Sequence, residues 1–221
     1  LNPERDWQLD VGVAVKHEDW RAGARFYHAW VEDYVTYADD TVVDFADARL
    51  LQYVNTPLAT LVGVELDWEY DIAPRWTPFA RMAYIDGRDR TIGQPLPSIP
   101  PMDSTLGIRF HDSEGGRRWG IEFAARVVND QYRTGQIRIA GGTDVTTDFE
   151  ERTPGFTVYN LRGYWNVKKN LNLIAGIENL LDKTYQEHLD LRLLGPTGFP
   201  GTATRVWAPG FTPYAGINWV F

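Results

Sequence analysis

Residue types that could carry catalysis or hold a metal are few in this chain of 221 residues, and they are widely spaced. There is no Cys, which excludes disulfides, thiolate metal sites and Cys nucleophiles. The four His residues, His17, His28, His111 and His188, lack the mutual spacing of metal ligands. No G-x-S-x-G, H-E-x-x-H or phosphate-binding loop is present. We therefore expect no catalytic residues, no enzyme activity, no metal site and no cofactor.

Three further features leave alternatives open. Residues 37–47 carry four Asp, whose carboxylates could hold a calcium ion, but the Gly and closing Glu of an EF-hand loop are missing. A solvated acidic loop is the favoured interpretation. His188 lies in a long polar segment, where it could contact a ligand or pack against Tyr185. His111 lies near a short turn and is interpreted as a polar, inward-facing residue.

Charged residues of both signs alternate with apolar residues in several segments. Residues two apart on a strand share a face, so these charges are expected to line one polar face. Charges that leave water are costly unless they are paired, so pairing across this face is expected. The set comprises Asp10, Lys16, Arg25, Glu65, Asp67, Glu69, Arg81, Arg109, Glu122, Arg126 and Arg162.

The overall composition narrows the class of protein. Lys and Arg number 22 against 30 Asp and Glu, a net charge of −8, which argues against a nucleic-acid partner. Eighteen apolar residues never run together, so no membrane-spanning helix is expected. A membrane-spanning β-barrel stays possible, because its strands are only half apolar. The aromatic fraction is 14%, and the positions of these residues along the predicted elements have to be explained.

A period of two dominates the chain and predicts strands. In the first segment Trp7, Leu9, Val11, Val13 and Val15 alternate with polar or small residues, as in a strand with one apolar face. Helical spacing is not sustained anywhere. The third segment contains a Pro at position 57, where a bulge or break is expected. About nine strands are predicted, at 7–17, 20–37, 48–71, 75–87, 103–112, 118–130, 155–167, 171–181 and 211–221.

The predicted connections alternate between short and long. Short turns separate one set of strand ends, whereas long polar segments at 38–47, 88–102, 131–154 and 182–210 separate the other. Outer-membrane barrels have short periplasmic turns and long extracellular loops. Aromatic residues gather at the turn end and are predicted to form a membrane girdle, although a soluble β-sandwich with core aromatics is the alternative. The girdle comprises Trp20, Trp76, Trp119, Trp165, Trp219 and Phe221.

Several motifs resemble those of TonB-dependent outer-membrane receptors. Residues 62–66 (VGVEL) resemble a barrel strand of that family, and 84–87 with 95–101 resemble its strand–loop–strand element ending in P-x-x-P-P. The T-P-G-F at 153–156 is similar to the opening of a late strand. The most specific match is E-N-L-L-D-K-T-Y at 178–185 with His188.

The resemblance implies an all-β fold: an antiparallel transmembrane β-barrel of 22 strands in the bacterial outer membrane, of which residues 1–221 supply the C-terminal part. An odd count of about nine strands agrees, because single-chain bacterial barrels have even counts. The family's plug domain and TonB box precede the barrel, so both are expected to be absent from this chain. Implied partners are outer-membrane lipid, the plug domain, TonB through the N-terminal part, and the assembly machinery through Phe221.

The function implied by the resemblance is TonB-energised uptake of a siderophore, another metal chelate or a cobalamin-like ligand. Two rival functions stay open: a small closed barrel serving as a pore or anchor, and a soluble carbohydrate-binding β-sandwich. An outer-membrane enzyme is a more distant alternative, since no triad is present. The extracellular segments are expected to bind the ligand. Candidate ligand-binding residues are Arg88, Arg90, Gln94, Tyr132, Arg133, His188 and Arg192.

Overall fold

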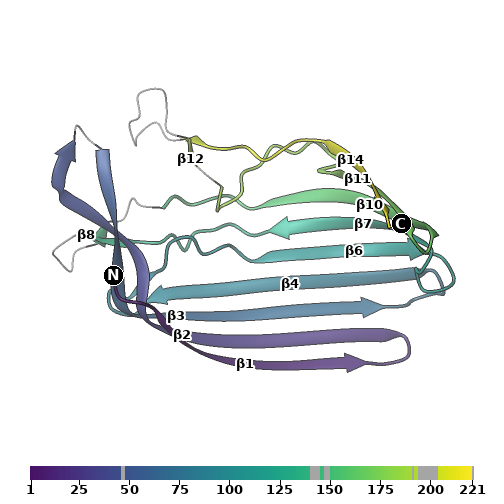
Figure 1. Cartoon of the computed structure of the whole chain (residues 1–221), viewed down its shortest axis with the longest axis horizontal. Helices are drawn as coiled ribbons and strands as arrows, with labels where there is room; N and C mark the ends of the chain where they lie inside the picture. The colour runs from purple at the N-terminus through teal and green to yellow at the C-terminus, as the bar shows by residue number, and fades with distance from the viewer. Residues whose placement is uncertain (46–47, 140–144, 147–149, 191, 194–203, 221) are drawn as a thin grey trace.

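Nine long antiparallel strands form one curved sheet in the computed structural model (Figure 1). The structure describes residues 1–221 except 46–47, 140–144, 147–149, 191, 194–203 and 221. No described helix is long and apolar enough to cross a membrane. The long strands are β1 (Arg5–Lys16), β2 (Trp20–Phe45), β3 (Ala48–Tyr70), β4 (Trp76–Asp89), β6 (Asp103–His111), β7 (Trp119–Val128), β10 (Phe156–Lys168), β11 (Leu171–Glu178) and β14 (Thr212–Trp219).

Each long strand pairs with the long strands before and after it in the chain, from β1 at one edge to β14 at the other. Within the described residues, β1 and β14 do not pair with each other, so the sheet is open. Hairpin turns lie at one end, where the chain also terminates, and long connections lie at the other (Figure 1). We call these the turn end and the loop end. The predicted antiparallel strands are confirmed, and so are three of the four predicted long connections, at 88–102, 131–154 and 182–210.

Five short strands lie in the long connections, and the sequence did not predict them. They are β5 (Gln94–Pro95), β8 (Ile137–Ile139), β9 (Val145–Thr146), β12 (Arg192–Leu193) and β13 (Thr204–Arg205). β5 pairs with β4, and β8 runs parallel to β2. β12 and β13 pair only with each other. The long connections therefore add pairing at the loop end.

The prediction of a long polar loop at 38–47 is wrong. β2 continues to Phe45 and pairs with β3 through Asp40↔Leu50, with a register shift before Phe45↔Ala48. The β-branched run Thr41-Val42-Val43 favours a strand there, which the neighbouring Asp residues obscured. Residues 46–47, the end of the acidic run considered for calcium, lie outside the described residues.

Of the bulge or break expected at Pro57, the bulge is wrong, and the break is limited to one missing pair. β3 runs through this residue, and the register is the same on both sides, with Glu32↔Leu58 and Tyr34↔Thr56. Only the pair between Asp33 and Pro57 is missing, because Pro has no N–H to donate. Asp33 adopts a positive φ of 52° at this position. A local backbone adjustment thus accommodates the Pro without an extra residue.

The two faces of the sheet differ in chemistry. On β1 the apolar face remains open, with Trp7, Val11 and Val13 all exposed. Buried apolar clusters lie at the loop end instead, one around Ala59, Leu96 and Ile99 and another around Val128, Phe156 and Val158. Exposed apolar side chains on a single-layer sheet fit a lipid-facing wall and contradict the soluble β-sandwich, which needs a second sheet to cover them.

Candidate functional site

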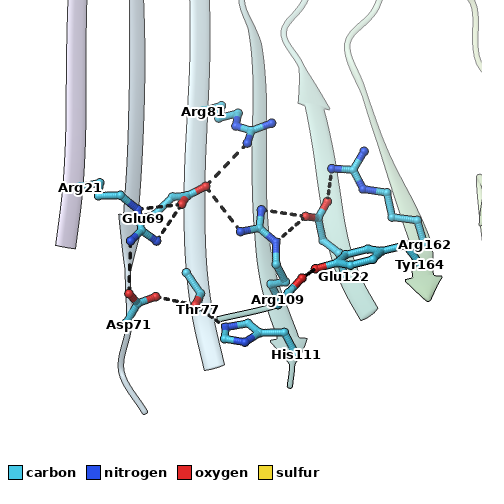
Figure 2. A network of polar contacts seen from close by, with 11 residues as sticks. Arg21, Glu69, Asp71, Thr77, Arg81, Arg109, His111, Glu122, Arg162 and Tyr164 are labelled. Carbon is cyan, nitrogen blue, oxygen red and sulfur yellow. Dashed lines mark hydrogen bonds and ion pairs between the residues drawn. The ribbon is translucent and has the colours of Figure 1, made fainter. Parts of the chain in front are cut away.

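Charged side chains from six neighbouring strands form a continuous network on the inner face, near the turn end (Figure 2). The register creates it: Arg21 pairs with Glu69, Arg109 with Glu122, and Glu122 with Arg162. Directly paired residues share a face of the sheet, so their side chains meet. We call this set the ionic ladder; it comprises Arg21, Glu69, Arg81, Arg109, Glu122 and Arg162.

Each carboxylate of the ladder lies between arginines. Glu69 contacts Arg21 at 3.0 Å, Arg109 at 3.6 Å and Arg81 at 3.7 Å. Glu122 contacts Arg109 at 3.1 Å and Arg162 at 2.6 Å. Interleaved signs of this kind offset the cost of removing the carboxylates from water. The predicted pairing of charges across one face is thus confirmed for five of the predicted residues: Glu69, Arg81, Arg109, Glu122 and Arg162.

An aromatic ring supports the middle of the ladder. Phe79 is buried, and the guanidinium groups of Arg81 and Arg109 lie 5.5 and 5.2 Å from its ring centroid. A Cβ atom on Gly107 would lie only 2.4 Å from Cζ of Phe79, so the close approach of this ring requires glycine there. The ring therefore fixes the height of two arginines above the sheet.

A hydrogen-bonded chain extends the ladder to the turns (Figure 2). Arg21 contacts Asp71 at 3.4 Å, and the Thr77 hydroxyl donates to Asp71 at 2.6 Å. The two ring nitrogens of His111 lie 3.0 Å from the Thr77 hydroxyl and 2.8 Å from the carbonyl of Asp112. Both ring nitrogens of His111 are therefore engaged, which fixes the orientation of the ring. His111 is inward-facing as expected, and buried.

The turn after β6 is organised by a single carboxylate. Asp112 accepts backbone N–H groups of Glu114, Arg118 and Trp119 at 2.7 to 2.9 Å. Burial alone would raise the pKa of Asp112, but these backbone donors hold it below its usual range. The Tyr164 hydroxyl donates to the Gly116 carbonyl of the same turn. The turn is therefore a rigid floor beneath the ladder.

Ladder, turn and neighbouring strands together enclose a cavity of about 780 Å³. Its lining includes Arg21, Asp71, Arg109, Glu122 and Tyr164. In the ladder and its Asp71 extension, four guanidinium groups face three carboxylates, and Asp67 lies directly opposite Arg81 on the same face. Arg162, at one end of the ladder, is not buried: 57% of its side chain is exposed. The arrangement can bind a polar surface carrying an additional carboxylate.

A second polar cluster lies at the loop end and is buried. His188 contacts Glu150 at 3.0 Å and Thr153 at 2.8 Å, and only 1% of its side chain is exposed. Glu150 also accepts the backbone N–H groups of Ser98 and Gly135, at 3.0 and 2.5 Å. We call these five residues the loop staple, since they join three long connections. Burial alone would raise the pKa of Glu150, but His188 and the two N–H donors lower it.

The predicted ligand-binding residues do not converge on one site. Both ring nitrogens of His188 are engaged in the staple, in agreement with the local-packing alternative, although its partners are Glu150 and Thr153 rather than Tyr185. Gln94 lies in β5, and Tyr132 is exposed on the connection after β7. The backbone of Arg192 lies in β12, but its side chain is outside the described residues. Arg88, Arg90 and Arg133 lie on or beside the outward face.

The predicted girdle residues lie in one band at the turn end. Trp119 pairs with Trp165, and Phe110 lies between Trp76 and Trp119 at ring distances of 4.6 and 5.3 Å. Trp20 begins β2 and Trp219 ends β14. The sixth predicted member, Phe221, lies outside the described residues.

Sequence reasoning missed several members of the polar clusters, notably Arg21, Asp71, Thr77 and Tyr164. Arg21 could have been found, because it shares the parity of the inward Arg25 on the same strand. Asp71 and Thr77 could have been found in the same way, because they share the parity of the inward Glu69 and Arg81 within the predicted strands 48–71 and 75–87. Within the described residues, no group of three or more His, Cys, Asp or Glu is placed to hold a metal ion.

The sheet is a single antiparallel meander with an apolar exposed face and a charged inner face, and it has short turns at one end and long connections at the other. These features define the wall of an outer-membrane β-barrel. Residues 1–180 match the family described as "TonB dependent receptor-like, beta-barrel". The chain belongs to this family, whose members lie in the outer membrane of Gram-negative bacteria.

Known proteins agree in fold. The solved structure of the copper transporter OprC superposes with a TM-score of 0.81 and 28% identity over 99% of this chain and 31% of that one. The ferrienterobactin receptor of Escherichia coli K12 is 23% identical over 99% of this chain and 30% of its own length. Transferrin-binding protein A of Neisseria meningitidis serogroup B is 23% identical over 84% of this chain and 23% of its own length. The chain thus spans less than a third of these transport receptors.

Proposed function

We propose that this chain forms part of the barrel wall of an energised importer and that the ionic ladder holds the plug domain of the complete receptor. In this proposal TonB acts through the N-terminal part, and movement of the plug opens the path through the barrel. The wall itself performs no chemistry, and the protein is not an enzyme.

The observation that carries this proposal is the state of the ladder. Its carboxylates are satisfied by arginines of the wall, while the side chains of Arg81 and Arg162 stay more than half exposed. Such a surface favours a partner that brings carboxylates or backbone carbonyls to the inner face. A cavity of about 780 Å³ beside the ladder provides room for that partner's side chains.

The ligand is proposed to be a siderophore, another metal chelate or a cobalamin-like molecule, captured by the extracellular segments. Gln94 and Tyr132 are proposed to contact this ligand, and Arg192, whose side chain lies outside the described residues, stays a predicted contact. The aromatic band is proposed to lie at the periplasmic membrane interface, in contact with lipid. Phe221 is proposed to be recognised by the outer-membrane assembly machinery.

The rival of a small closed barrel is disfavoured because, within the described residues, the edge strands β1 and β14 do not meet. A pore of that kind would transport solute without an energy source. The two functions therefore differ in one measurable property, the dependence of uptake on TonB.

The test uses the complete receptor that carries this chain, expressed in cells without other uptake receptors. Accumulation of ferric enterobactin, haem, Cu(II) and cobalamin is measured with and without TonB. We expect TonB-dependent accumulation of one probe, and a several-fold loss in the double variant Arg81→Gln/Arg162→Gln with surface binding retained. Arg117→Gln, in an exposed turn, is the matched control. Accumulation that persists without TonB would overturn the proposal in favour of a pore.

A further inference from the structure

Three arginines gather on the outward face at the loop end, away from the inner-face sites described above. Arg88 pairs with Thr60, Thr60 with Trp30, and Trp30 with Trp7. Paired residues share a face, and Trp7 and Trp30 are exposed on the lipid-facing side of the sheet. Arg88 therefore points outward. Arg90, the residue after β4, donates to the Thr60 hydroxyl at 2.8 Å and covers the same face.

The height of these arginines is set by the strand itself. Arg88 follows the girdle residue Trp76 by twelve residues along β4. A tilted strand crosses the bilayer in about 9–11 residues. Arg88 and Arg90 consequently lie just beyond the apolar span, at the level of the headgroups of the outer leaflet. Trp30, in the row of Arg88, and Tyr84 below it supply the aromatic side chains typical of such an interface.

A fixed scaffold orients Arg88. The Asp86 carboxylate accepts one hydrogen bond from Nε of Arg88 at 3.0 Å and another from Nη1 of Arg133 at 2.5 Å. Arg133 is itself held by the Tyr84 hydroxyl and the Ile85 carbonyl, both at 3.0 Å, and its guanidinium lies 4.8 Å from the Tyr84 ring centroid. Arg133 is thus committed to the protein and acts as a positioning residue.

Arg88 and Arg90 are engaged only in part. Each donates to the protein through Nε, and their terminal amino groups make no hydrogen bond to any described residue. Arg88 has 49% of its side chain exposed. Three arginines against Asp86 give this cluster two positive charges in excess. Glu32, on the same face, lies in register with Arg5.

We propose that Arg88 and Arg90 bind the phosphate group of an outer-leaflet phosphoglycolipid. Two guanidinium groups on one face, two residues apart in the chain, can together donate to the oxygens of one phosphate, which a single point charge would bind less specifically. The outward direction, the height above the bilayer span and the flanking aromatics favour a lipid headgroup over an imported ligand, which would approach from the inner face. The site is independent of the ionic ladder.

The test is native mass spectrometry of the complete receptor in detergent, titrated with bisphosphorylated lipid A and with the same glycolipid lacking its phosphates. We expect binding of the phosphorylated form, and a loss of affinity of about tenfold or more in Arg88→Gln/Arg90→Gln, because charge-assisted hydrogen bonds are removed. Arg117→Gln, an exposed arginine at the turn end, is the control and is expected to bind like the wild type.

Three outcomes would overturn the proposal. One is equal binding of the phosphate-free glycolipid, which would make the contact apolar. Another is unchanged affinity in a double variant that still migrates as a folded barrel. The third is displacement of the lipid by inorganic phosphate, which would identify a site for a free anion.

Discussion

The two ends of this barrel wall use the same residue types in opposite ways. At the turn end, the ionic ladder runs across six strands, and its arginines Arg21, Arg81 and Arg162 are partly exposed. At the loop end, the staple buries one carboxylate and one imidazole, and every polar partner comes from the long connections. Open charges offer binding capacity, whereas buried and saturated charges hold segments in place. The turn end is therefore the better candidate for a partner surface.

The largest effect is expected from breaking the staple. Glu150→Ala leaves His188 and the N–H groups of Ser98 and Gly135 without their acceptor, at a cost of about 3 kcal/mol in the stability of this region. Hydrogen exchange in the complete receptor should show lost protection at Ser98 and Gly135. Glu18→Gln, at an exposed turn, is the control. Unchanged protection at the loop end would contradict the assignment of the staple as its anchor.

The next effect concerns the ladder. Glu122→Gln removes the charge between Arg109 and Arg162, with a cost of about 2 kcal/mol in the free energy of unfolding, because only 9% of the Glu122 side chain is exposed. Urea unfolding in lipid vesicles measures this change. The strands should remain paired, with no loss of protection at Ser98. A loss confined to the loop end would erase the distinction between the two ends.

Acidification should destabilise the loop end through Glu150. The pKa of Glu150 is lowered in the folded state by His188 and two N–H donors, against the effect of burial. Its contribution to stability is thus present above the unfolded pKa of about 4.3 and is lost as the pH falls through the lower folded value. Hydrogen exchange at Gly135 should stay slow from neutral pH to about 4.3 and accelerate below it. Acceleration already near pH 6 would contradict the assignment of this effect to Glu150.

The smallest effect on stability is expected at the exposed end of the ladder. Arg162→Gln removes a contact with Glu122 from a half-exposed side chain, at a cost of about 0.5 kcal/mol. Its effect on plug docking should be larger than its effect on unfolding. Comparing urea unfolding with protease release of the plug separates the two quantities. Equal losses in both would mean that Arg162 serves the wall alone.

Alternation in the sequence was sufficient to predict the nine long strands, because one face is apolar and the other charged. Val11 and Glu65 each follow this rule. Alternation failed beyond residue 38, where Asp residues interrupt it while β2 continues to Phe45. Short strands such as β8 depend on contacts between distant segments and leave no period in the sequence.

The candidate site could be predicted only in part, for a related reason. Strand parity predicted that Glu69, Arg109 and Glu122 face inward. Their mutual contacts depend on the register between strands, which is set by turn lengths and pairing rather than by any one segment. The staple was less accessible still, because Glu150 meets His188 across 38 residues of chain. His188 was singled out by its place in a long polar segment and by the family motif, but its partners Glu150 and Thr153 were not predicted.

Site-specific photo-crosslinking in the complete receptor tests the central claim most directly. A photoreactive phenylalanine analogue is placed at Arg81, a half-exposed member of the ladder, and separately at the exposed Tyr132 at the loop end, followed by mass spectrometry of the adducts. We predict that the Arg81 position captures a segment of the plug domain, whereas the Tyr132 position does not. Capture of the plug from Tyr132 alone, with no plug adduct from Arg81, would contradict the assignment of the ladder as the docking surface.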